Sequence, residues 1–160
     1  MKRTMQGWFD AYSEHHQNGT NKLIHWICVP LIFFCVIGLL AAVPIGIGNT
    51  IGPAWAQPYL HLGTLVVVLG LLFYVRLSVP IALGMLVVCA AALMAVAAIK
   101  SAGLPLALIC LVTFVAAWVG QFVGHKIEGA KPSFLDDLQF LLIGPAWLLG
   151  FVFRAVGIRY

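Results

Sequence analysis

Long apolar stretches separated by short polar segments dominate the chain. Four of them cover residues 23–43, 59–75, 79–99 and 104–123. Each is close to the ~20 residues that a helix needs to cross the hydrocarbon core of a membrane. A fifth apolar stretch, residues 138–156, contains Gly144 and Pro145 near its middle. Because proline removes a backbone donor and kinks a helix, we expect a broken or re-entrant helix there, with a full fifth span as the alternative.

The segment before the first apolar stretch has a helical pattern of a different kind. Residues 6–17 place Trp8, Tyr12 and His16 on one row at i, i+4 spacing, and Trp and Tyr favour the membrane interface. The sequence Asn18-Gly19-Thr20 interrupts this helix, and Thr20 or Asn21 can cap the helix that follows. The pattern therefore predicts an all-α, polytopic membrane helix bundle. It has four transmembrane helices, an N-terminal interfacial helix and the C-terminal broken or re-entrant helix, in a single domain of residues 1–160.

The composition agrees with a membrane protein and excludes other classes. Hydrophobic residues make up 62 % of the chain and charged residues 9 %, against about 25 % charged residues in a typical soluble domain. The net charge of +4 is modest and the basic residues are scattered, so no nucleic acid partner is expected. The four cysteines lie inside the apolar stretches without C-x-x-C spacing, which indicates packing rather than a zinc site.

The basic residues predict the orientation in the membrane. Six of them lie on one side of the four predicted spans, and they are Lys2, Arg3, Lys22, Arg76, Lys126 and Lys131. The other side has only Lys100. The positive-inside rule then places the N-terminus and the end of the fourth span in the cytoplasm. The histidines at positions 16, 25 and 125 share this face, whereas His61 falls on the opposite one.

Imidazole and carboxylate groups at this face form a candidate metal site. Asn21 and His25 are four residues apart, and His125 and Glu128 are three apart, so each pair shares a helix face. The break after His16 lets the chain fold back, so that His16 and His25 can point into one site. Two histidines and one carboxylate that leave other coordination positions of the metal open are typical ligands of non-haem Fe(II).

Simpler interpretations stand beside the metal site. An interfacial histidine is more often just hydrogen-bonded, and we keep that interpretation for His15 and His61. Glu128 could pair with Lys126 or Lys131, an interaction worth ~0–1 kcal/mol at a surface. The chain could also be a small membrane protein that binds haem, transports a solute or assists assembly without this chemistry.

Two segments carry a more specific signal. The first is Tyr12-x3-His16-x4-Asn21-x3-His25-x4-Pro30. The second is Gln121-Phe122-x-Gly124-His125-x2-Glu128-x3-Pro132, followed by Leu135-Asp136-Asp137-Leu138. In this order and spacing they resemble the signatures of the Mpo-type family of 2-hydroxy fatty acid dioxygenases, formerly a membrane family of unknown function.

The resemblance implies an activity, a metal and a set of site residues. It implies an Fe2+-dependent dioxygenase that shortens 2-hydroxy fatty acids by one carbon with O2, next to membrane lipid. His16, His25 and His125 are the implied ligands, and Glu128 is either a fourth ligand or a group that orients a histidine. Residues expected to contact these ligands or the substrate are Tyr12, Asn21, Gln121, Lys126 and Lys131. The expected location is a bacterial inner membrane or, in a eukaryote, the endoplasmic reticulum; the oligomeric state stays open.

Overall fold

The chain folds into helices throughout the part that the structure describes. A computed structural model of the protein describes residues 4–45, 52–129, 131 and 139–160. The Pro132 and 135–138 positions of the second signature lie outside these residues. The helices are α1 (Met5–Glu14), α2 (Gly19–Ala42), the short 3₁₀ helix η1 (Gln57–Tyr59), α3 (Leu62–Val75), α4 (Val79–Ser101), α5 (Leu106–Glu128) and α6 (Phe140–Ala155). The predicted all-α class is confirmed for this part of the chain.

Among the helices of the described residues, three are long and apolar enough to cross a membrane, and they are α2, α4 and α5. We expected four such helices. The helix α3 has 14 residues, which span ~21 Å at a rise of 1.5 Å per residue, less than the ~30 Å hydrocarbon core. Exposed leucines and valines cover the outer faces of these helices, including Leu69, Val87 and Val112. Such surfaces are typical of helices that face lipid.

The C-terminal helix runs through its proline. The structure has α6 continuous from Phe140 to Ala155 with Pro145 inside it, so the break that we expected at Gly144-Pro145 is not observed. Proline costs one hydrogen bond to the carbonyl four residues earlier, while burial supports the helix on both sides of it. Ile143, Ala146 and Trp147 are at most 1 % exposed.

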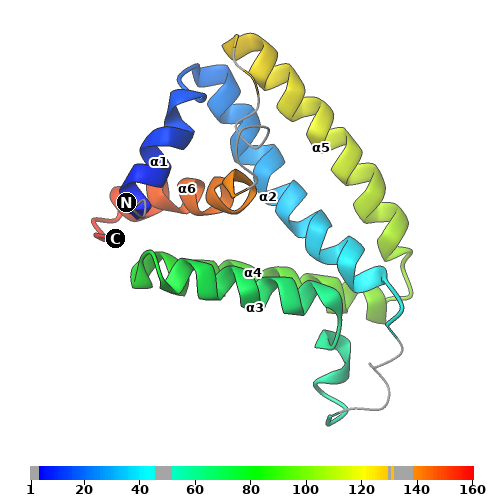
Figure 1. The fold of residues 1–160 in the computed structure, drawn as a ribbon. Helices are drawn as coiled ribbons and strands as arrows, with labels where there is room; N and C mark the ends of the chain where they lie inside the picture. Colours follow the sequence, from blue (N-terminus) through cyan, green and yellow to red (C-terminus); the bar gives the residue numbers. More distant parts are fainter. Residues whose placement is uncertain (1–3, 46–51, 130, 132–138) are drawn as a thin grey trace.

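The helices α2 and α5 form the closest pair of the bundle (Figure 1). Small residues make this approach possible, as in many membrane helix pairs. A Cβ on Gly38 would overlap the Cys110 thiol, and a Cβ on Gly120 would lie 2.8 Å from Cys28 Sγ. All four cysteines are buried free thiols, as the packing interpretation predicted. This close pairing sets the distance between the N-terminal turns of α2 and the C-terminal turns of α5.

The helix α1 packs its aromatic face on α6 rather than leaving it free. The rings of Trp8 and Phe140 have centroids 5.5 Å apart, and those of Tyr12 and Trp147 are 5.1 Å apart. The Trp147 Nε1–H donates a hydrogen bond to Ser13 Oγ at 2.9 Å. The Trp8–Tyr12 row, which we expected at the membrane interface, is thus an internal contact, because aromatic side chains bury much apolar area when they meet a second aromatic surface.

Candidate metal centre

Three histidines from three separate segments meet at one point. His16 follows α1, His25 lies in the second turn of α2, and His125 lies in the last turn of α5. Their exposed fractions are 0 %, 0 % and 5 %. One ring nitrogen from each lies within 4.8 Å of the other two. A buried group of three imidazoles of this size could hold a metal ion.

A tight turn at residues 15–18 brings His16 and His25 together. The Asn18 side chain accepts hydrogen bonds from the backbone N–H groups of Thr20 and Asn21. Asn18 is therefore the cap of α2, rather than Thr20 or Asn21 as the sequence suggested. The helix starts at Gly19, and the chain reverses so that His25 lies next to the end of α1. The centroids of the His16 and His25 rings are 4.2 Å apart.

The hydrogen bonds of these two histidines determine which ring nitrogens are protonated. His16 Nδ1 lies 2.6 Å from the Tyr12 carbonyl oxygen, and His25 Nδ1 lies 2.9 Å from the Asn21 carbonyl oxygen. A carbonyl oxygen can only accept, so each Nδ1 carries the proton and each Nε2 presents a lone pair. The two Nε2 atoms nevertheless lie 2.9 Å apart. Two lone pairs at this distance repel each other unless a cation lies between them.

A proton is a poor candidate for that cation. Burial, and then the neighbouring His25 imidazole, lower the pKa of His16 to about 3. The ring is therefore neutral at physiological pH, which is the form that binds a metal. The Nδ1 of His125 is also buried and has no hydrogen-bond partner among the described residues. The donor set thus fits a metal ion that takes nitrogen ligands.

Glu128 binds the turn that carries His16. Its carboxylate accepts hydrogen bonds from the backbone N–H of Gln17 at 2.7 Å and of Asn18 at 2.9 Å, and from Asn21 Nδ2 at 2.9 Å. Its oxygens do not belong to the group of mutually close donor atoms formed by the three histidines. The carboxylate therefore connects the end of α5 with the 15–18 turn and the start of α2.

Gly124 provides the space for this connection. Asn21 is fully buried, and a Cβ on Gly124 would overlap its side-chain oxygen. The close approach of α5 to Asn21 therefore requires glycine at this position.

We expect Gly124→Ala to lower the stability of the protein by about 1–3 kcal/mol, because an added methyl group in a filled contact displaces its neighbours. It should also weaken metal binding by moving Asn21. Thermal unfolding and metal affinity in detergent measure both effects. Gly19→Ala is the matched control, since a Cβ there meets nothing within 4 Å. Equal stability of the two variants would contradict the tight contact.

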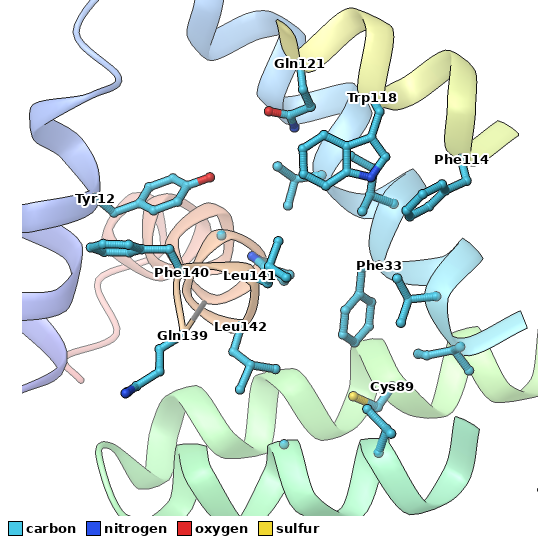
Figure 2. A pocket seen from close by; sticks show the side chains of 18 of the residues that line it. Tyr12, Phe33, Cys89, Phe114, Trp118, Gln121, Gln139, Phe140, Leu141 and Leu142 are labelled. Carbon is cyan, nitrogen blue, oxygen red and sulfur yellow. The ribbon is translucent and has the colours of Figure 1, made fainter. Parts of the chain in front are cut away.

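An apolar cavity opens beside the histidines. It has a volume of about 460 Å³, and its polar end includes Tyr12, His16, Gln121 and His125. Figure 2 shows Tyr12 and Gln121 at one end of the space and Cys89 near the other. The ring of Tyr12 stacks on His16 at 4.2 Å between centroids. Burial raises the pKa of Tyr12 above its ordinary value, so its hydroxyl stays protonated and can donate a hydrogen bond.

The remaining polar residues that the sequence singled out are not among the three clustered donors. Lys126 and Lys131 are exposed, and His15 is half-buried. His61 caps α3 by accepting a hydrogen bond from the Thr64 N–H, and it lines a separate cavity with Lys100. The structure thus brings together Tyr12, Asn21, Gln121 and Glu128 around the three histidines, and leaves the lysines at the surface.

Sequence reasoning missed the apolar residues that shape the site. Trp147 lies 5.5 Å from the His16 ring between centroids, and Phe33, Gly70 and Phe140 line the cavity. No sequence signal distinguishes them, because each lies in a segment that is apolar throughout.

Comparison with known families covers almost the whole chain. The family model described as "2-hydroxy-palmitic acid dioxygenase Mpo1-like" matches residues 2–156. The chain belongs to the Mpo1-like family. The Mpo1-like match includes both histidine segments and confirms the predicted family. No curated protein and no solved structure matches the chain. The description of the Mpo1-like family names a dioxygenase, and three buried histidines that could hold a metal are in keeping with it.

Proposed function

We propose that the protein is an Fe2+-dependent dioxygenase that shortens 2-hydroxy fatty acids by one carbon. The observation that carries this proposal is the pair of facing His16 and His25 Nε2 atoms, 2.9 Å apart, at the polar end of an apolar cavity. Imidazole ligands suit iron, and a cavity with one polar end suits an amphiphile. The Mpo1-like family description supplies the substrate class and the reaction type.

In this proposal His16, His25 and His125 hold the iron. The iron supplies the redox chemistry with O2 and a template for the oxygen atoms of the substrate. Glu128 acts by fixing the 15–18 turn, since its oxygens are used by Gln17, Asn18 and Asn21. The backbone carbonyls of Tyr12 and Asn21 hold the two histidine rings in the tautomer that directs Nε2 at the metal.

The protein side chains around the metal bind and orient the substrate. The protonated hydroxyl of Tyr12 and the amide of Gln121 can donate hydrogen bonds to the hydroxyl and carboxylate oxygens of a 2-hydroxy acid. The apolar lining of the cavity excludes water from the reacting carbon atoms. Lys126 and Lys131, exposed near the end of α5, attract the anionic head to the membrane face, which we assign to the cytoplasmic side.

The reaction balances with O2 as the only co-reactant. A 2-hydroxy acid and O2 give the acid that is one carbon shorter, carbon dioxide and water. The hydroxyl-bearing carbon becomes the new carboxyl group, the bond to the old carboxyl carbon breaks, and the four electrons released reduce both oxygen atoms of O2.

The test is turnover by protein purified anaerobically and loaded with iron. We expect iron-dependent O2 uptake with a 2-hydroxy fatty acid, release of its carboxyl carbon as carbon dioxide, and a product one carbon shorter. The same acid without the 2-hydroxyl group is the control and should give no uptake. Iron-loaded protein that consumes no O2 with any 2-hydroxy acid would contradict the proposal.

A b-type haem protein is the second candidate, and the geometry supports it less. Haem bound between two histidines needs space for the porphyrin between the ring nitrogens, and 2.9 Å between the two Nε2 atoms leaves none. A Soret band in the purified protein would select this candidate.

A further inference from the structure

The cavity beside the histidines continues far beyond the polar end into the apolar interior. It reaches from Tyr12 and Gln121 to Cys89 on α4 (Figure 2). Its volume of about 460 Å³ lies in the range of roughly 300–1,000 Å³ that is typical of small-molecule sites. Among the described residues that line it, none is Asp, Glu, Lys or Arg. The space therefore suits an unbranched apolar chain attached to a polar head.

The helix α3 lines the cavity at the end away from the histidines. Tyr74 is 1 % exposed, and its hydroxyl donates a hydrogen bond to the Leu142 carbonyl at 2.6 Å. Its polar atom is thus satisfied, and the aromatic ring is left to line the cavity together with Val67. This contact ties α3 to α6 and holds the α3 wall of the cavity in place.

Gly70 is the one small residue of α3 in this wall. It is buried and lines the cavity between Val67 and Tyr74 on the same helix. A Cβ there would meet a single heavy atom within 4 Å, Leu142 Cδ2 at 3.9 Å. The position has free space in front of it, so a larger side chain would occupy the cavity rather than strain the helix packing.

We propose that this cavity holds the acyl chain of the substrate and that Gly70 sets the longest chain that it accepts. The proposal rests on the proposed function for the identity of the head group. The polar end beside the histidines receives the head. The rest of the lining is apolar except for Gln139, which argues for a single apolar chain attached to that head. Each methylene group that leaves water should raise the binding constant about fourfold, until the chain reaches the wall at α3.

The experiment measures binding of 2-hydroxy acids of increasing chain length to the purified protein in lipid nanodiscs. For the wild type, affinity should rise with each added carbon up to a limit and then stop rising. Gly70→Leu should move that limit to chains several carbons shorter, while the affinity for the shortest acids stays unchanged. Val68→Phe is the matched control, because it adds as many carbon atoms on the same helix at a position that is 48 % exposed and should leave the limit in place.

A second variant tests the opposite direction and guards against misfolding of the first. Phe33 lines the cavity, and its ring points from α2 towards Cys89 in Figure 2, so Phe33→Ala should move the limit to longer chains. Unchanged limits in both variants, or a loss of affinity that is equal for all chain lengths, would overturn the proposal. A membrane phospholipid that stays bound in the cavity and is not displaced by 2-hydroxy acids would also overturn it.

The binding assay separates this inference from the proposed function. The protein could fail to oxidise any 2-hydroxy acid while its chain-length limit still shifts in the variants. That result would support the acyl-chain site and contradict the dioxygenase. Turnover of 2-hydroxy acids with a chain-length limit that is the same in wild type and Gly70→Leu would support the dioxygenase and contradict the acyl-chain site.

Discussion

Replacing His25 with alanine is expected to abolish metal binding and turnover together. The variant removes one of the two Nε2 atoms that face each other at 2.9 Å, and no other described imidazole can replace it, since His15 and His61 lie outside the group. The loss in metal affinity should exceed the 10–100-fold that typically follows removal of a residue that only supports a ligand. Metal analysis of the purified protein and O2 uptake measure the two effects.

The matched control for this variant is His15→Ala. His15 lies beside His16 in the sequence and is half-buried, but its ring is not among the clustered donors. It should keep its metal and most of its activity. A His25→Ala protein that folds, as judged by its helical circular dichroism, and still binds a full complement of metal would rule out the histidine site.

Replacing Glu128 with alanine should weaken metal binding about 10–100-fold, as expected for a group that orients a ligand. The change leaves the N–H groups of Gln17 and Asn18 and the amide of Asn21 without their acceptor, so the turn that carries His16 should loosen. Faster hydrogen exchange of the amides at residues 15–18 would report this directly. Glu14→Ala, which removes an exposed carboxylate, is the control.

The glutamine variant separates the two roles of Glu128. Glu128→Gln keeps an oxygen that can accept from Gln17 and Asn18, and it places an amide nitrogen against Asn21 Nδ2 instead. If Glu128 positions the turn, this variant should retain more metal than Glu128→Ala. Equal and complete loss of metal in both variants would indicate that the carboxylate is itself a ligand.

The sequence pointed to the three histidines that the structure brings together, whereas it left open what Glu128 contacts. Histidines at 16, 25 and 125 are conspicuous in a chain with 9 % charged residues, and helical spacing places Asn21 with His25 and His125 with Glu128. The partners of Glu128 are 107 to 111 residues away, and no periodicity connects such distant positions. The position of the α2 cap was missed by two or three residues, because Asn18, Thr20 and Asn21 are all capable of capping.

The pattern of apolar residues determined the helical class, the approximate helix bounds and the membrane character of the chain. It did so because helix length and local spacing are properties of contiguous sequence. Only the tertiary structure decided that α1 buries its aromatic row on α6, and that an apolar cavity lined by Gly70 lies beside the histidines. An apolar side chain has the same sequence signature whether it faces lipid, another helix or an empty space. The arrangement of the helices, set by small residues such as Gly38, Gly120 and Gly124 between α2 and α5, therefore determines how the histidines meet.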